Sequence, residues 1–208
     1  MKALIFCLFC ITYSFCFSQQ KEEFRQVKNY YNHHRNMLNT EFKKKFDAEA
    51  DSFRKANIKL DFMLFMKKMD SIENVAMIGA LLKVRNLEDL QTLKSPKGIS
   101  ENTIEKTAVF DKSADYPGGF NTLRQEVANL FYTGGVYTET KTVKTNVGFI
   151  VEKDGSISNV HAQGDNFTFN RQAEIALYSV SEKFSPAVSK GDPVRYYLRL
   201  PLTLTIED

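Results

Sequence analysis

Apolar and other residues alternate along the chain from residue 194 to residue 206, and this pattern restricts the fold more than any other feature. One set of alternate positions holds Val194, Tyr196, Leu198, Leu200, Leu202, Leu204 and Ile206, and the other holds Arg195, Tyr197, Arg199, Pro201, Thr203 and Thr205. A strict period of two predicts a β-strand with one face packed on apolar residues and one face in water. Pro201 has no amide hydrogen to donate to a ladder, so we expect the strand at an edge of its sheet.

A strand at a sheet edge leaves backbone N–H and C=O groups unpaired, and another extended chain can add to it. We therefore expect this strand to be the binding site. The site consists of Val194, Arg195, Tyr196, Tyr197, Leu198, Arg199, Leu200, Pro201, Leu202, Thr203 and Leu204. Among them Arg195, Tyr197 and Arg199 are the candidate recognition side chains, because arginine and tyrosine are enriched where binding energy concentrates. An ordinary hydrated strand face explains these three side chains equally well.

The chain before this strand predicts an α+β domain. Apolar residues at helical spacing predict one helix over 120–131 and another over 169–184. Asp154-Gly155 predicts a two-residue type I′ turn between two strands. Ile157 and Val160 are out of phase, which predicts a bulge in the second of these strands. The order α-β-β-α-β predicts a three-stranded antiparallel sheet packed on two helices, within a domain of residues 113–208.

The first half of the mature chain, residues 19–93, has the composition of a helical segment. Apolar residues recur every three or four positions from Phe24 to Phe46, which predicts one long helix. A second apolar run follows from Ile58, and Asp70 or Ser71 is expected to cap a new helix within it. Turn residues begin at Lys94, so residues 94–112 are interpreted as a linker.

Residues 1–18 predict a secretory signal peptide. Lys2 precedes an apolar run that ends before Ser18-Gln19-Gln20, and the run is shorter than the roughly 20 residues of a membrane-spanning helix. The mature chain is therefore expected in the periplasm or outside the cell. Two alternatives stay open: an uncleaved leader that anchors the protein in the membrane, and a lipoprotein signal in which Cys16 is lipidated.

Composition and motifs exclude several kinds of chemistry. Cys7, Cys10 and Cys16 all lie in the leader, so cleavage leaves no thiol for a disulfide or a metal site. The formal charge of +3 becomes +2 with the loss of the leader, which argues against a nucleic-acid partner. His33 and His34 point about 100° apart on a helix, so no metal site is predicted there. No catalytic triad, phosphate loop or HExxH motif is present, so we expect no enzyme, no catalytic residues and no cofactor.

Several short motifs in the C-terminal half resemble the TonB C-terminal domain family, in the form found in Bacteroidetes-type bacteria. They are Tyr116-Pro117-Gly118-Gly119, Val147-Gly148-Phe149-Ile150-Val151-Glu152-Lys153-Asp154-Gly155-Ser156-Ile157, Phe184-Ser185-Pro186, Gly191-Asp192-Pro193-Val194 and Leu200-Pro201-Leu202-Thr203. The resemblance depends on their order and spacing and covers about residues 109–206. Phe184 stands where the family often has tryptophan.

The resemblance implies a periplasmic domain for transmembrane transport, which captures an extended segment of an outer-membrane TonB-dependent transporter by β-strand addition. The last strand, here 194–204, supplies the edge, and Tyr116 and Pro117 lie near the partner surface. Another extended peptide, or the same edge of a second copy in a homodimer, is a further possible partner.

The chain departs from a full energy transducer of this family. Such a transducer has a membrane helix and a proline-rich spacer before the domain, and here a helical segment replaces the spacer. Without a tether the domain would bind but could not transmit force, whereas a retained leader would make it a full TonB-type transducer. A further hypothesis is a structural or self-associating envelope protein in which the N-terminal helices cover the sheet edge.

Overall fold

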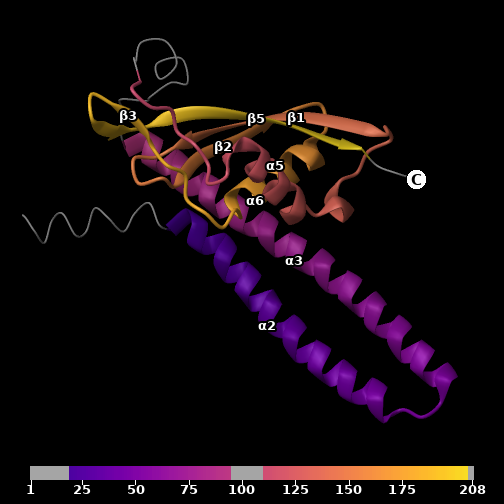
Figure 1. The fold of residues 1–208 in the computed structure, drawn as a ribbon. Coiled ribbons are helices and arrows are strands. Elements are labelled where there is room, and N and C mark those ends of the chain that lie inside the picture. The colour runs from indigo at the N-terminus through magenta and orange to yellow at the C-terminus, as the bar shows by residue number, and fades with distance from the viewer. Residues whose placement is uncertain (1–18, 95–109, 206–208) are drawn as a thin grey trace, which may run out of the picture.

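The computed structural model describes residues 19–94 and 110–205, which form an α+β fold (Figure 1). Two long helices are followed by a domain of helices and strands. In chain order the elements are α2 (Gln19–Ala48), α3 (Ser52–Lys94), α5 (Gly119–Leu130), the 3-10 helix η1 (Thr133–Gly135), β1 (Thr142–Val151), β2 (Ile157–Gln163), α6 (Phe167–Tyr178), β3 (Ala187–Ser189), β4 (Asp192–Val194) and β5 (Tyr196–Thr205). The predicted leader and most of the predicted linker lie outside the described residues.

β1 is the central strand of a three-stranded antiparallel sheet in the order β2-β1-β5, which confirms the predicted sheet. The ladder between β1 and β5 is continuous from the pair Thr142–Thr205 to the pair Val151–Tyr196. α6 packs on β1 and β2. The α6 residues that face the sheet are buried, as their helical spacing predicts: Phe169, Ala173, Ala176 and Leu177.

The turn between β1 and β2 differs from its prediction. Gly155 has a φ of 80°, but Asp154 is not among the residues of positive φ, so the predicted type I′ turn is wrong. The Gly155 amide instead donates to the Glu152 carbonyl at 3.0 Å and closes a four-residue turn that ends in a left-handed glycine. A Cβ on Gly155 would lie 2.1 Å from the Phe184 carbonyl oxygen, so both the backbone angle and the space require glycine.

The bulge predicted in β2 is confirmed. The register of β2 shifts between Gly148 and Ile150 of β1, so two residues of β2 oppose one residue of its neighbour. The extra residue is Asn159, which adopts a φ of 50°. This shift brings Val160 into the core, where it is fully buried.

The predicted final strand is interrupted near its start. Val194 belongs to β4, which pairs with β3 in a separate two-stranded sheet. Lys190 and Gly191, with φ of 54° and 84°, form the turn of that hairpin. Arg195 lies between the strands, and β5 begins at Tyr196. The prediction of one continuous strand from residue 194 is therefore wrong. The alternation continues across the break, because it depends on which face is apolar and not on which strand is the neighbour.

α2 and α3 form an antiparallel helical hairpin. Arg35 of α2 pairs with Asp70 of α3 at 2.6 Å and also with Glu73, while the rings of Phe42 and Phe62 stack at 4.0 Å nearer the turn. α3 runs without a break through residues 70 and 71, so the predicted cap of a new helix is wrong. The Asp70 carboxylate is occupied by the ion pair, and the neighbouring leucines and methionines favour a continuous helix.

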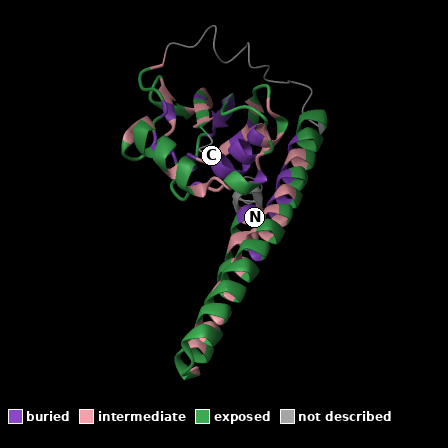
Figure 2. Cartoon of the chain, turned by 90° about the vertical axis from the view of Figure 1, so that its right-hand side faces the viewer, coloured by how far each residue is buried: buried purple, intermediate pink, exposed green. Residues whose placement is uncertain are grey.

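The base of the hairpin shares its core with the sheet domain. Phe24 of α2 and Leu81 and Val84 of α3 belong to the same buried cluster as Phe149 of β1 and Leu177 of α6. The rest of the hairpin extends away from the domain, and its surface is largely exposed (Figure 2). The helical segment and the sheet domain are thus separate along the chain but joined in one core. No helix within 19–94 or 110–205 has the length and apolar character needed to cross a bilayer.

Candidate functional site: the two edges of the sheet

The registers of the β1–β2 and β1–β5 ladders determine which backbone N–H and C=O groups of β5 point to β1 and which point outward. The amide of Ala162 in β2 donates to the Glu174 carboxylate of α6 at 2.8 Å, away from β1. Its partner Val147 must therefore direct its own N–H and C=O toward Leu200 of β5. The backbone of Leu200 consequently points to β1, and that of Pro201 points to the outer edge.

Every second residue of β5 presents its backbone to this outer edge. They are Tyr197, Arg199, Pro201, Thr203 and Thr205. Pro201 offers a carbonyl but no N–H, so the row of outward N–H donors along β5 is interrupted at this one residue. Within the described ranges no other strand pairs with this edge. β5 is thus an edge strand, as the proline predicts.

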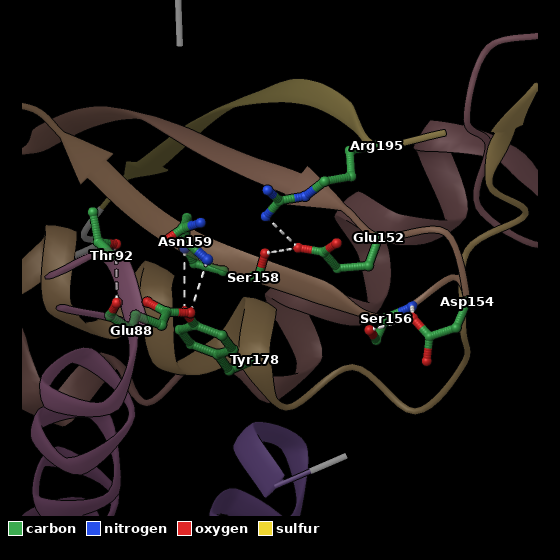
Figure 3. A network of polar contacts seen from close by, with 10 residues as sticks. Glu88, Thr92, Glu152, Asp154, Ser156, Ser158, Asn159, Tyr178 and Arg195 are labelled. Atoms are coloured by element: carbon green, nitrogen blue, oxygen red, sulfur yellow. Dashed lines mark hydrogen bonds and ion pairs between the residues drawn. The ribbon is translucent and has the colours of Figure 1, made fainter. Parts of the chain in front are cut away.

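The other edge of the sheet is closed by side chains (Figure 3). On β2, the amide of Asn159 donates to the Glu88 carboxylate of α3 at 2.8 Å. The amide of Val160 donates to the Tyr178 hydroxyl of α6 at 3.1 Å, and that hydroxyl in turn donates to Glu88 at 2.8 Å. The next outward amide, that of Ala162, donates to Glu174 of α6. Side chains of α3 and α6 therefore occupy the backbone donors of β2 that an added strand would need. Of the two edges, only that of β5 lacks such contacts to its outward amides from a neighbouring strand among the residues that the structure describes.

The two carboxylates that accept from the edge amides of β2, those of Glu88 and Glu174, are buried, and their pKa values are raised. Burial raises the pKa of Glu88, and the hydrogen bonds from Asn159 and Tyr178 offset this only in part. Burial likewise raises the pKa of Glu174, although the Ala162 amide and the Arg85 guanidinium, 2.5 Å away, favour its charged form. Tyr178 has a pKa raised well above its usual value by burial and by the neighbouring Glu88. These groups hold the hairpin, α6 and the sheet edge together.

The apolar face of β5 is covered unevenly. Leu200 is fully buried, whereas Leu198, Leu202 and Leu204 are half-buried. Tyr196 packs edge-on against Phe110, with the ring centroids 4.8 Å apart. A strand added beside β5 would cover the exposed part of these leucine side chains. The inward side chains of such a strand should therefore be apolar.

The candidate recognition side chains differ from their predicted exposure. Arg195 is half-buried and donates to the Glu152 carboxylate at 2.6 Å, and Ser158 donates to the same oxygen (Figure 3). Arg195 is therefore less exposed than predicted, because this ion pair holds it against the sheet, and its role in recognition stays a prediction. Tyr197 is half-buried, and its hydroxyl lies over Gly148, where a Cβ would approach it to 2.0 Å. Arg199 is exposed, with its guanidinium 5.4 Å from the centre of the Tyr197 ring.

Tyr116 and Pro117, the second part of the predicted site, lie in different surroundings. Tyr116 is buried, so its side chain is not available for direct contact with a partner, and the expectation that it lies near the partner surface stays a prediction. Its ring packs edge-on against Phe184 at 4.9 Å, and its hydroxyl donates to Glu126. Pro117 is exposed. Tyr116 thus contributes to the core at the start of the domain.

A pocket of about 210 Å³ lies where the hairpin meets the domain. Its wall includes Arg35, Asn74 and Gln172 together with apolar side chains such as Phe131. Arg35 pairs with two carboxylates, and Gln172 donates to Asn74 at 2.6 Å. Lys28 also lines the pocket, and its ammonium has no ion-pair partner among the described residues.

Sequence reasoning did not identify Glu88, Glu174 or Tyr178 as part of the site. One signal was present for Glu174, because it is the only formally charged residue in the otherwise uncharged run 172–178. Its contact with an edge amide could not be read from that run, since the contact depends on the bulge that shifts β2. Glu88 lies on a different element, 71 residues from Asn159.

Comparison with known proteins adds no relative to this picture. No family model, curated protein or solved structure matches the chain.

Proposed function

We propose that this chain is a non-enzymatic binding protein of the cell envelope, which captures an extended polypeptide segment by β-strand addition to β5. The observation that carries the proposal is the asymmetry of the two sheet edges. The outward amides of β5 lack a neighbouring strand within the described residues, whereas those of Asn159, Val160 and Ala162 in β2 are bonded to buried side chains. An added strand has one edge available to it.

The resemblance to the TonB C-terminal domain family suggests the source of the segment. We propose the periplasm as the location and an outer-membrane TonB-dependent transporter as the partner, in transmembrane transport. The half-buried leucines of β5 favour a segment with apolar residues at alternate positions, because those side chains would extend the packed face of the sheet. Pro201 restricts the register in which a segment can pair with β5, since it has no N–H to donate to a carbonyl of the added strand.

The position of the helical hairpin bears on the alternative of a structural protein with a covered edge. α3 contributes Glu88 to the β2 edge, and α6 contributes Tyr178 and Glu174. The helices therefore cover the edge opposite to β5. This arrangement favours a binding role for β5 over a purely structural one.

The test uses proline to remove one outward donor from β5. Thr203→Pro deletes an amide that faces the outer edge, while the inward amides that pair with β1 are kept; Thr203→Val is the matched control and retains the amide. Synthetic peptides with the sequences of N-terminal extended segments of outer-membrane transporters from the same bacterium serve as fluorescent probes. We expect fluorescence anisotropy to show binding to the unmodified chain and to Thr203→Val, and at least roughly tenfold weaker binding to Thr203→Pro, because a hydrogen bond is lost and the ring obstructs the incoming strand.

Circular dichroism and the midpoint of urea unfolding establish that both variants are folded. Arg199→Pro, which removes another outward amide, provides an independent measurement. Equal affinity of the unmodified chain and both proline variants would exclude strand addition at β5. Absence of binding to every peptide, with the chain folded, would exclude transporter segments as the partner.

A further inference from the structure

α3 has a second apolar face that the hairpin and the domain leave uncovered. Its inner side packs through Phe62 on α2 and through Leu81 on the domain core. Its outer side carries exposed apolar residues at helical spacing, with exposed fractions from 50% to 74%: Phe53, Leu64, Phe65, Ile72 and Val75. At 100° per residue, Leu64 and Val75 lie opposite the buried side of α3 that includes Phe62 and Leu81, whereas Phe65, three residues from Phe62, and Ile72 lie at the flank of that side. A face of this kind is typical of a contact with another helix.

Two opposite charges lie in the middle of this outer face. Asp61 and Lys68 are both exposed and are seven residues apart, which places them two turns from each other on the same side of the helix. Among the residues that the structure describes, neither forms an ion pair or a hydrogen bond through its side chain. Leu64 and Phe65 lie between them, and the adjacent turns place Asn57 and Ile58 beside Asp61 and Ser71 and Ile72 beside Lys68. The occupant of this face must therefore supply a positive and a negative charge at the corresponding spacing.

A second copy of α3 meets this requirement when it runs antiparallel. A two-fold axis between Leu64 and Phe65 places Asp61 of each copy beside Lys68 of the other, which gives two ion pairs in the dimer. The same axis brings Leu64 against Phe65 and the highly exposed Phe53 toward Val75 of the other helix. The overlap from residue 53 to residue 76 is roughly 36 Å long. Because α3 contacts the domain from Asn74 onward, which is the end of this overlap, the two sheet domains lie at opposite ends of the helix pair.

Other occupants fit the charges less well. A parallel pairing of two α3 helices places Asp61 against Asp61 and Lys68 against Lys68, which is repulsive. A lipid surface would have to take up the Asp61 carboxylate in the centre of the inserted face, which is unfavourable. The symmetry of the charges favours an identical partner, since a two-fold interface requires each patch to complement itself.

We infer that the chain forms a homodimer in which the outer faces of two α3 helices pack antiparallel, with Asp61 and Lys68 paired across the two-fold axis. This contact is separate from β5. It leaves both β5 edges open, so the dimer presents two strand-addition sites at its two ends. The inference does not depend on the function proposed for β5.

The test reverses the two charges separately and then combines the variants. Sedimentation velocity of the purified full-length chain measures the dimer dissociation constant. Asp61→Lys and Lys68→Glu each replace two attractive pairs by two repulsive ones, so each variant alone should dimerise at least roughly tenfold more weakly. An equimolar mixture of the two variants should recover dimerisation, since each copy then supplies the charge that the other lacks. Lys59→Glu, an exposed charge on another side of α3, is the control and should leave the dimer unchanged.

The inference is overturned by a chain that stays monomeric, by a dimer that the reversals do not weaken, or by a mixture that does not recover. A dimer that Thr203→Pro abolishes, and the charge reversals leave intact, would show pairing through β5 and would also overturn it. Flotation with phosphatidylglycerol vesicles tests the remaining occupant. Binding of the monomer to vesicles, with loss of binding in Leu64→Glu and no dimer at any concentration, would assign the face to lipid.

Discussion

Two donors, the amide of Asn159 and the hydroxyl of Tyr178, converge on one oxygen of the Glu88 carboxylate. Glu88 is buried and lies on the helical hairpin, whereas the donors lie on the sheet and on α6. A single residue thus joins three elements. Because the acceptor is one oxygen, an uncharged amide could replace the carboxylate without losing either hydrogen bond.

This geometry predicts different effects for two substitutions of Glu88. Glu88→Gln keeps an acceptor oxygen for both donors, so we expect a small change in the free energy of unfolding. Glu88→Ala leaves both buried donors unpaired, and we expect a loss of roughly 2 kcal/mol or more. Urea unfolding of the two variants and the unmodified chain measures both effects. Equal losses in the two variants would mean that the acceptor oxygen is unimportant.

The raised pKa of Glu88 adds a dependence on pH with a definite sign. Since burial raises this pKa above 4.5 in the folded chain, folding favours the protonated carboxyl. The stabilisation is fully present at low pH and is lost as the pH rises through the folded-state pKa. Glu88→Gln does not titrate there, while Glu174 titrates in both proteins. We therefore expect Glu88→Gln to gain stability relative to the unmodified chain from pH 4.5 toward neutral pH. A constant difference across this range would contradict the expectation.

At the scale of the elements, the main contrast is between the two edge strands. β5 carries a proline at an outward position, a common means of limiting uncontrolled edge pairing in β-sheets. β2 has no proline, and its outward amides are instead bonded to side chains of α3 and α6. One edge is restricted in its register but open, and the other is closed.

Amide hydrogen exchange in the free protein distinguishes the two edges. We expect the outward amides of Asn159, Val160 and Ala162 to exchange at least about tenfold more slowly than that of Thr203, because these three amides donate to helix side chains and no strand among the described residues pairs with the outer side of Thr203. Nuclear magnetic resonance with residue assignments measures all four amides in one sample. Protection of Thr203 equal to that of the β2 amides would mean that the β5 edge is covered, and the structural hypothesis would then be preferred.

At the scale of the whole molecule, the helical hairpin and the sheet domain are joined through a common core. Leu81 of α3 is buried in that core, and its neighbour Leu82 is half exposed to solvent. The substitutions Leu81→Ala and Leu82→Ala remove the same atoms from adjacent positions. They form a matched pair that measures how much the docked face of α3 stabilises the protein.

We expect Leu81→Ala to lower the free energy of unfolding by about 2–5 kcal/mol and Leu82→Ala by about 0.5 kcal/mol or less. The chain has no tryptophan, so far-ultraviolet circular dichroism follows mainly the long helices, and tyrosine fluorescence follows the domain once Tyr30 and Tyr31 of α2 are replaced by phenylalanine in all variants. Coincident unfolding by the two probes is expected for one shared core. Separate transitions, with Leu81→Ala affecting only the helical one, would mean that the hairpin is an independent unit.

Local patterns were sufficient for much of the fold. The stripe of α6 predicted its buried face, the phase change between Ile157 and Val160 predicted the bulge, and Pro201 predicted an edge strand. In each case the signal lies within a few residues, because helix period, strand period and the lack of a proline amide are properties of the local chain. The break at Arg195 was missed, since a hairpin that preserves the alternation leaves no mark in it.

The sequence by itself therefore determined that residues 19–93 are helical, where the three strands of the main sheet lie, which faces are apolar, and which strand can only be an edge. The tertiary structure alone decided that Arg195 is held by Glu152, that Tyr116 is buried, and that Glu88 and the α6 side chains close the second edge. These outcomes depend on contacts between residues far apart in the chain, up to 71 positions for Glu88 and Asn159. Periodicity describes one segment relative to its own axis, whereas closing a sheet edge requires the relative placement of several segments in space.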